Sequence, residues 1–126
     1  MTILVGYTHT PEGAAALHHG REAARTLGQP LALFPLFETN SEQRWPDPAL
    51  EAELEPQTQF LAPAEDSPRP AEELVDRSNQ LGAALIVIGV RSRSRMGKIL
   101  MGSDAQSIIL GATVPVLSVK AAGDER

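Results

Sequence analysis

The sequence contains no cysteine, and this absence excludes several kinds of chemistry. Without cysteine there is no disulfide framework, no thiolate metal site and no cysteine nucleophile. The composition is compatible with a reducing compartment, and we expect the protein to be cytoplasmic.

Long apolar segments are also lacking. No apolar run approaches the ~18 residues that a membrane-spanning helix needs, and the N-terminus lacks the basic segment that begins a signal peptide. We therefore expect a soluble, non-secreted protein that has no membrane partner.

Positive charge is scarce, because 11 Lys and Arg residues stand against 16 Asp and Glu, which gives a net charge of -5 at pH 7. Nonspecific binding of nucleic acid depends on positive charge that is clustered over a broad face. We therefore expect no nucleic-acid partner.

Apolar runs alternate with helical patterns along a chain of 126 residues, which is long enough for one domain with one core. Gly28 and Gly82 are natural stops for two of the expected helices. The expected strands are Thr2–Tyr7, Leu31–Phe37, Gln57–Ala62, Ala84–Ile88 and Val114–Val119, and the expected helices begin at Pro11, Pro48, Ala71 and Ser103.

This alternation predicts an α/β fold, a single-domain, doubly wound parallel sheet with helices on both faces. The segment Pro48–Leu54 predicts a short second helix of about two turns. Ligands of such sheets bind outside the carboxyl ends of the strands, where neighbouring connections leave in opposite directions.

The stretch from Gly89 to Ser103, G-V-R-S-R-S-R-M-G-K-I-L-M-G-S, gives the strongest indication of a ligand. Gly89 would let the chain turn off the strand, and Gly102 would let backbone approach a ligand closely. The first N–H groups of the following helix lack intrahelical partners and can bind an anion. The loop also concentrates positive charge, at Arg91, Arg93, Arg95 and Lys98.

Two side chains in this region have more specific expected roles. Among the basic residues of the loop, Arg91 is the one that we expect to contact a phosphate. Ser103 and Gln106 have the S-x-x-Q spacing of a capping box, which predicts that the Ser103 side chain caps the last helix.

The spacing of Gly89, Gly102 and Ser103 resembles the G-x2-G-x9-G-[ST] nucleotide loop of the universal stress proteins, small α/β domains that often bind ATP or AMP. The resemblance continues through I-L-V-G-Y-T-H-T-P, A-E-E-L-V-D, L-I-V-I-G and V-P-V-L-S-V. It implies a universal stress protein domain over residues 1–120, a frayed tail over 121–126, and a sheet in which the first and fourth strands are neighbours. The loop from Thr8 to Pro11 would then face the basic loop.

Compared with the family pattern, the second helix is abbreviated, and the chain departs from that pattern at two further places. Ser92 replaces the second glycine, and T-H-T replaces the family's D-G-S after the first strand, so that Thr8 stands where an aspartate is common. Thr8 can accept a hydrogen bond, while His9 can donate to phosphate or stack on a base. The residues expected to bind ATP or AMP are Thr8, His9, Thr10, Gly89, Arg91, Ser92, Gly102 and Ser103.

Signatures of catalysis and of metal binding are not found. The sequence has no H-E-x-x-H, no G-x-S-x-G and no Walker A motif. His18 and His19 occupy adjacent helical positions, whose side chains diverge by about 100°, so they do not readily chelate one ion. We assign no catalytic residue and no metal ligand.

Three functions remain open from the sequence. The first is a stress-response regulator that binds an adenine nucleotide, the second is a dimeric interaction module of the same fold that binds none, and the third is a slow ATPase or phosphotransferase. A homodimer through Val114–Val119 is expected because this apolar strand would otherwise leave an exposed sheet edge. The alternative is a monomer whose edge is shielded by Lys120–Arg126.

Overall fold

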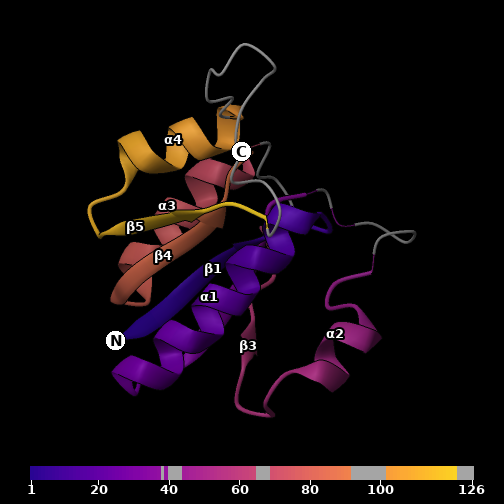
Figure 1. Cartoon of the computed structure of the whole chain (residues 1–126). Coiled ribbons are helices and arrows are strands. Elements are labelled where there is room, and N and C mark those ends of the chain that lie inside the picture. The colour runs from indigo at the N-terminus through magenta and orange to yellow at the C-terminus, as the bar shows by residue number, and fades with distance from the viewer. Residues whose placement is uncertain (38, 40–43, 65–68, 92–101, 122–126) are drawn as a thin grey trace.

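The structure is a computed structural model that describes residues 1–37, 39, 44–64, 69–91 and 102–121 (Figure 1). Its centre is a five-stranded sheet in the order β3-β2-β1-β4-β5, and all neighbouring strands are parallel. The strands are β1 Thr2–Tyr7, β2 Leu31–Pro35, β3 Gln59–Phe60, β4 Ala83–Gly89 and β5 Val116–Val119. The helices are α1 Pro11–Leu27, α2 Pro48–Glu53, α3 Pro70–Gln80 and α4 Ser103–Gly111.

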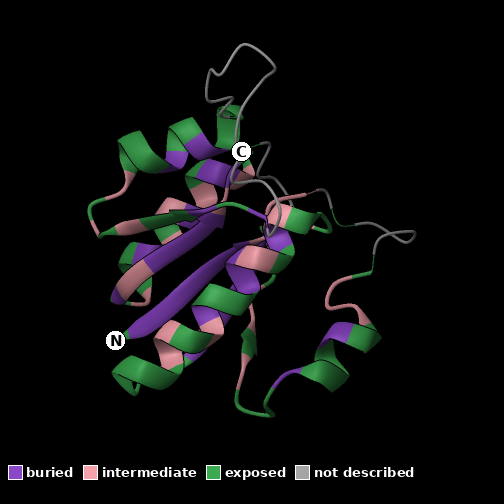
Figure 2. Ribbon diagram, in the orientation of Figure 1, coloured by how far each residue is buried: buried purple, intermediate pink, exposed green. Residues whose placement is uncertain are grey.

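Helices cover both faces of the sheet, because successive residues of a buried strand point to opposite sides. In β1, Leu4 points toward a core shared with α3 and α4, whereas Ile3 and Val5 point toward a core shared with α1 and α2. Figure 2 shows the sheet's central strands buried along most of their length and the helices exposed on their outer sides. The predicted doubly wound α/β fold and its short second helix are confirmed.

The first helix begins and ends as its sequence predicts. The Thr10 side chain accepts a hydrogen bond from the Gly13 N–H at 3.0 Å, Pro11 occupies the first turn, and Gly28 closes the helix with a φ of 62°. These residues act on the backbone within or next to the helix, so the folded protein keeps the helix ends that the sequence predicts.

The capping box predicted for the last helix is wrong. α4 starts at Ser103 as expected, but the cap residue is Gly102, with extended φ and ψ of -65° and 160°, and glycine has no side chain with which to cap the helix. Since Ser103 is already the first helical residue, its hydroxyl is not at the position from which a cap side chain reaches the following N–H groups.

Three strands are shorter than expected. β2 ends at Pro35, β3 contains only Gln59–Phe60, and β5 begins at Val116. Proline has no N–H to donate to a neighbouring strand. Pro115, just before β5, therefore contacts β4 only as an acceptor, since its carbonyl accepts a hydrogen bond from the Ile86 N–H. β5 lies at the sheet edge, as its proline predicts.

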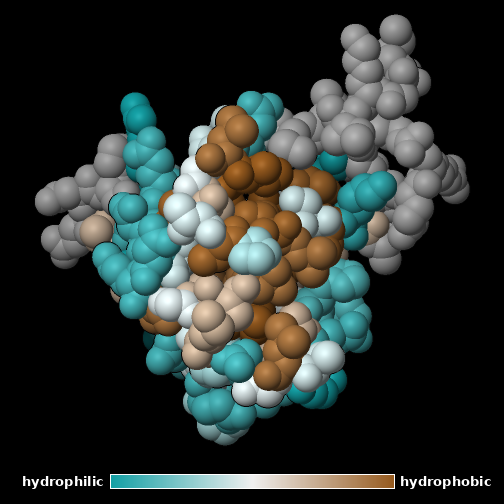
Figure 3. All heavy atoms as spheres, turned by 90° about the vertical axis from the view of Figure 1, so that its left-hand side faces the viewer, coloured by the Kyte–Doolittle hydropathy of each residue, from teal (hydrophilic) through white to brown (hydrophobic). Residues whose placement is uncertain are grey.

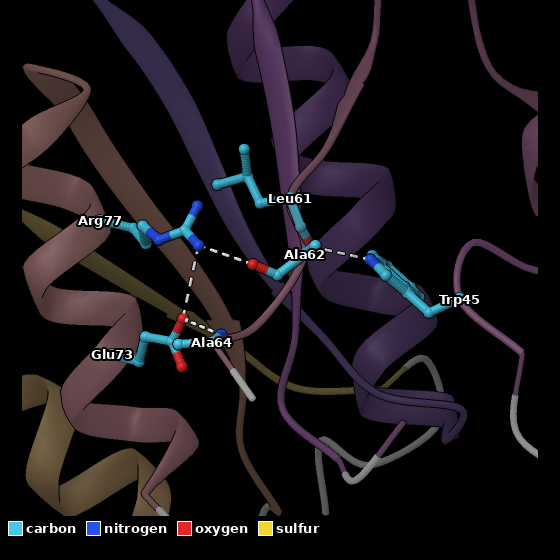
Figure 4. Close-up of polar contacts among 6 residues, drawn as sticks. All are labelled: Trp45, Leu61, Ala62, Ala64, Glu73 and Arg77. Atoms are coloured by element: carbon cyan, nitrogen blue, oxygen red, sulfur yellow. Dashed lines mark hydrogen bonds and ion pairs between the residues drawn. The ribbon is translucent and has the colours of Figure 1, made fainter. Parts of the chain in front are cut away.

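Side chains tie down the connection between β3 and α3, residues 61–64, which we call the strap (Figure 4). Three hydrogen bonds hold its backbone: Trp45 Nε1–H to the Leu61 carbonyl (2.8 Å), Arg77 to the Ala62 carbonyl (2.6 Å), and the Ala64 N–H to the Glu73 carboxylate (2.8 Å). Arg77 and Glu73 also pair with each other at 3.5 Å.

The C-terminal boundary stays a prediction. Ala121, which was expected in the tail, is buried, and residues 122–126 lie outside the described part of the chain. None of the described helices has the length and apolar composition needed to cross a bilayer.

Candidate functional site

The carboxyl ends of β1 and β4 lie side by side, with Gly6 opposite Ile88 in the ladder. The connections after these strands diverge, because β1 leads through α1 to β2 on one side and β4 leads through α4 to β5 on the other. A pocket of about 170 Å³ opens at this point. Its lining residues are Thr8, Thr10, Glu12, Leu36, Ile88, Gly89, Val90, Arg91, Gly102, Asp104, Ala105 and Ile108.

The pocket gathers most of the residues that the sequence singled out. Those that line it are Thr8, Thr10, Gly89, Arg91 and Gly102. His9 and Ser103 are described but do not line it, and Ser92 lies outside the described residues. Residues 92–101, which join the lining residues Arg91 and Gly102, also lie outside the described part of the chain.

Sequence reasoning missed the pocket's apolar wall and its two acids. Leu36, Ile88 and Ile108 line it, and Ile88 and Ile108 are also buried core residues. Glu12 and Asp104 were not singled out at all. The available signal was their position, since each lies in the first turn of a helix that begins at this edge of the sheet.

The loop after β1 is held by hydroxyl groups and by close packing. Thr8 Oγ1 and Thr10 Oγ1 are 2.7 Å apart, and either can donate to the other. A Cβ added at Gly13 would overlap the carbonyl oxygen of Thr8. The loop is therefore fixed against the first turn of α1, with both threonines at the pocket.

Gly89 has a different role from the one expected of it. It is the last residue of β4 and is not in the left-handed region, so no sharp turn requires it. A Cβ on Gly89 would overlap the backbone carbonyl of Glu12. Glycine is needed here because the first turn of α1 packs directly on the end of β4.

Gly102, by contrast, has open space beside it among the described residues. A Cβ there would meet no atom of those residues within 4 Å. Gly102 itself has no side chain to cap the first turn of α4, whose N–H groups have no intrahelical acceptor. This is the part of the pocket where backbone donors and the positive end of the helix dipole favour an anion.

Charged side chains of both signs line the pocket. Arg91 Nε lies 3.8 Å from Glu12 Oε1, and the side chains are 78% and 20% exposed, respectively. Asp104 is an exposed residue in the first turn of α4. Among the described residues, no group of three or more His, Cys, Asp or Glu side chains gathers in a way that could hold a metal ion.

His9 belongs to an aromatic cluster instead of the pocket. Its ring centroid is 5.2 Å from that of Tyr7 and 4.8 Å from that of Phe37, and the cluster continues to Trp45 and Phe60. Burial, followed by the nearby carboxylates of α2 and its cap residue, raises the pKa of the Tyr7 phenol. The cluster thus links the loop after β1 to the strap through Trp45.

Comparison with known proteins identifies the family of this chain. Residues 1–120 match the universal stress protein family. A universal stress protein of Mycolicibacterium smegmatis is 32% identical over 128 residues, covering 96% of this chain and 98% of the relative.

Solved structures show the same fold. A universal stress protein in complex with cAMP superposes with a TM-score of 0.66 at 18% identity, covering 97% of this chain and 98% of that one. A universal stress protein from Archaeoglobus fulgidus in complex with dAMP gives 0.57 at 20% identity, with coverage of 94% and 96%. Because the family match and the Mycolicibacterium relative each cover nearly the whole length of the chain, it belongs to the universal stress protein family.

Proposed function

We propose that this protein is a cytoplasmic stress-response regulator that binds an adenine nucleotide, ATP or AMP, in the pocket between β1 and β4. The observation that carries the proposal is that five residues chosen from the sequence for this role line one pocket, from loops far apart in the chain. Family membership and the cAMP and dAMP complexes of two structural neighbours support it.

The pocket offers different chemistry at its two sides. Leu36, Ile88 and Ile108 supply an apolar surface suited to a nucleobase, while the start of α4 supplies backbone donors for phosphate. The hydroxyls of Thr8 and Thr10 can donate to or accept from a ribose or phosphate oxygen. In this proposal Ser92 contributes from the loop after β4 and Ser103 from the first turn of α4, and His9 acts by holding the loop after β1.

Extraction of co-purifying nucleotide and thermal unfolding test the proposal. At ligand near 100 times its dissociation constant, the protein should gain about 2.7 kcal/mol, which raises the melting temperature by several degrees. Gly102→Val should abolish the shift and leave the unliganded melting temperature unchanged, because the side chain enters open space in the pocket. A wild-type melting temperature that does not move at millimolar ATP or AMP contradicts the proposal.

A second candidate is a dimeric interaction module of the same fold without nucleotide. The Glu12–Arg91 pair inside the pocket favours it, because the preferred phosphate partner is already engaged. Absence of extracted nucleotide together with an unchanged melting temperature would select this candidate.

The third function that the sequence leaves open is a slow ATPase or phosphotransferase. Measurement of phosphate release from ATP at high protein concentration tests it.

The regulator is proposed to act as a homodimer through β5. This edge strand carries Val116, which is half-buried, and Leu117, which is 39% exposed. Figure 3 shows apolar side chains gathered on the side of the molecule where α4 ends and β5 begins. Leu110, near the end of α4, is 85% exposed. A second copy paired along β5 would cover an edge and apolar surface that are otherwise left to water.

A further inference from the structure

A second hollow lies at the end of the sheet opposite to the pocket between β1 and β4. It has a volume of about 490 Å³ and is bounded by the last two turns of α1, the start of β2 and the connection from α2 to β3, residues 54–58. We call it the amino-end pocket, because it lies where the strands begin. Leu31, the first residue of β2, lines it, whereas Leu36, just past the end of β2, lines the other pocket. At about 3.3 Å per residue of strand, these two leucines lie roughly 16 Å apart, so the pockets are separate sites.

Helical spacing explains why the α1 wall of this pocket is both hollow and basic. Arg21, Ala24 and Arg25 are three or four residues apart and lie along one face of the helix, and Gly28 follows as its cap. Ala24 and Gly28 are small, and a Cβ on Gly28 would meet no atom of the described residues within 4 Å. The two arginine side chains therefore line an open space instead of a packed interface.

Both arginines keep hydrogen-bond donors that the rest of the protein does not use. The terminal nitrogens of Arg21 lie 3.2 Å from Glu55 and 3.8 Å from Glu53, but its Nε is buried and has no hydrogen-bond partner among the described residues. Buried donors are nearly always hydrogen-bonded in folded proteins, so these two acids satisfy the guanidinium incompletely. Arg25 is exposed and forms no ion pair with a described residue, and its charge acts on Glu55 only at longer range.

The balance of charge in the lining favours an anion. Among the described residues, the lining contributes the two guanidinium groups of Arg21 and Arg25 against the one carboxylate of Glu55. All three residues belong to the stretches 1–37 and 44–64, which the structure describes without a gap. The chain as a whole carries a net charge of -5, so this local excess of positive charge contrasts with the overall composition.

We propose that the amino-end pocket binds a small anionic metabolite, whose carboxylate or phosphate group is held between Arg21 and Arg25. A guanidinium presents paired N–H donors that match two oxygens of either group. Thr58 adds a hydroxyl, while Pro30 and Leu31 add apolar surface for the rest of the ligand. A hollow of this size with apolar walls and a few polar groups is typical of sites for small molecules. This site goes beyond the proposed nucleotide function and does not depend on it.

A purely structural role of the same residues makes different predictions. Arg21 would then serve only to tie α1 to the segment around Glu55, and Arg25 only to stabilise the last turn of α1 through the helix dipole. In that case no anion binds, and neutral substitutions change only the stability. If an anion does bind, Glu55 competes with it for Arg21, so that Glu55→Gln weakens the tie but strengthens the binding of the anion.

The test is an NMR titration of the full, isotope-labelled chain with malonate and, separately, with inorganic phosphate. Sodium chloride keeps the ionic strength constant, so that nonspecific screening does not change during the titration. Either probe should produce saturable shifts of the backbone amides of Gln29 and Thr58, which line the pocket. Arg25→Gln should weaken this binding about five- to tenfold, and Glu55→Gln should strengthen it. Arg69→Gln, which changes an exposed arginine at the start of α3 outside this pocket, is the matched control and should keep the wild-type affinity.

Each outcome decides for or against the amino-end pocket. Saturation by only one probe supports the site and tells which group it holds. Absence of saturable shifts with both probes at tens of millimolar overturns the proposal, and so does an unchanged affinity in Arg25→Gln. Gly102→Val, which alters the other pocket, should leave the shifts at the amino-end pocket intact, and their loss in that variant would overturn a separate site. Arg25 is exposed, and Glu55→Gln supplies a second variant whose effect has the opposite sign.

Discussion

Two glycines of the same sequence motif differ in what surrounds them. A side chain on Gly89 would overlap the Glu12 backbone, whereas one on Gly102 would enter open space. Backbone atoms cannot rotate away as a flexible side chain can, so the first α1 turn would have to move. Gly89 is a packing residue, and Gly102 is free to serve a ligand.

We predict that Gly89→Ala lowers the free energy of unfolding by about 2 kcal/mol or more, whereas Gly102→Ala changes it by less than about 0.5 kcal/mol. Urea denaturation followed by circular dichroism measures both. Equal effects of the two substitutions would contradict the distinction.

Tyr7 offers a second test at this scale, because it is the only tyrosine of the chain. Burial in the aromatic cluster, with further contributions from Asp47 and Glu53, raises the pKa of its phenol above the ordinary value of 10.0. Ultraviolet titration of tyrosinate should therefore show a midpoint above 10.0 in the folded protein. Asp47→Asn should lower that midpoint while leaving it raised, because burial is the largest cause.

The sign of the linked stability change follows from the direction of the shift. A phenol that holds its proton more tightly when folded contributes stability that is present below the unfolded pKa and lost as pH rises through the folded pKa. The free energy of unfolding should thus fall as the pH rises above 10.0. Tyr7→Phe should remove the part of this fall that comes from ionisation of the phenol. A phenol midpoint at or below 10.0 would contradict the prediction.

Among the elements, the strap over residues 61–64 depends most on side chains from elsewhere. Glu73 is 10% exposed and holds the Ala64 N–H, and one of its oxygens is buried without a partner among the described residues. Arg77 holds the Ala62 carbonyl and offsets the Glu73 charge. The strap is therefore fixed by α3, since β3 is only two residues long.

We predict that Arg77→Ala destabilises the fold by about 1–3 kcal/mol, because it leaves a largely buried carboxylate without its cation. Glu73→Gln should cost less, since the amide oxygen can still accept from Ala64. Denaturant titration gives the free energies, and hydrogen exchange at the Ala64 amide should accelerate in the Arg77 variant. If Arg77→Ala were as stable as wild type, the pair would not hold the strap.

Element boundaries illustrate what the sequence can and cannot predict. Thr10, Pro11 and Gly28 fix α1 through local backbone chemistry, so their effect is readable without a structure. The role of Gly89 depends on a contact with α1, a segment distant in the sequence, and no local pattern reports it. The pocket acids are likewise ordinary first-turn residues until the fold brings the two helix starts together.

On the scale of the whole molecule, the proposed dimer depends on the exposed edge of β5. Leu117→Lys would place a charge on this edge, a substitution that disfavours pairing between strands. We predict that wild-type protein is a dimer in sedimentation equilibrium and that Leu117→Lys is a monomer with unchanged circular dichroism.

Leu27→Lys is the matched control, because Leu27 is also an exposed leucine, at 54%, but is the last residue of α1 and does not belong to the edge strand. This variant should remain a dimer. A monomeric wild-type mass at tens of micromolar would refute the dimer and favour an edge that the chain shields by itself.

The pairing of β1 with β4 has a consequence for when the pocket comes into existence during folding. One wall comes from the loop after β1 and the opposite wall from β4 and α4, so no N-terminal fragment that ends before α4 contains the site. Closing so long a loop is slow compared with local helix formation. A chain emerging from the ribosome would complete its ligand site only after most of its length is synthesised, and ligand binding would then favour the finished fold over every earlier intermediate.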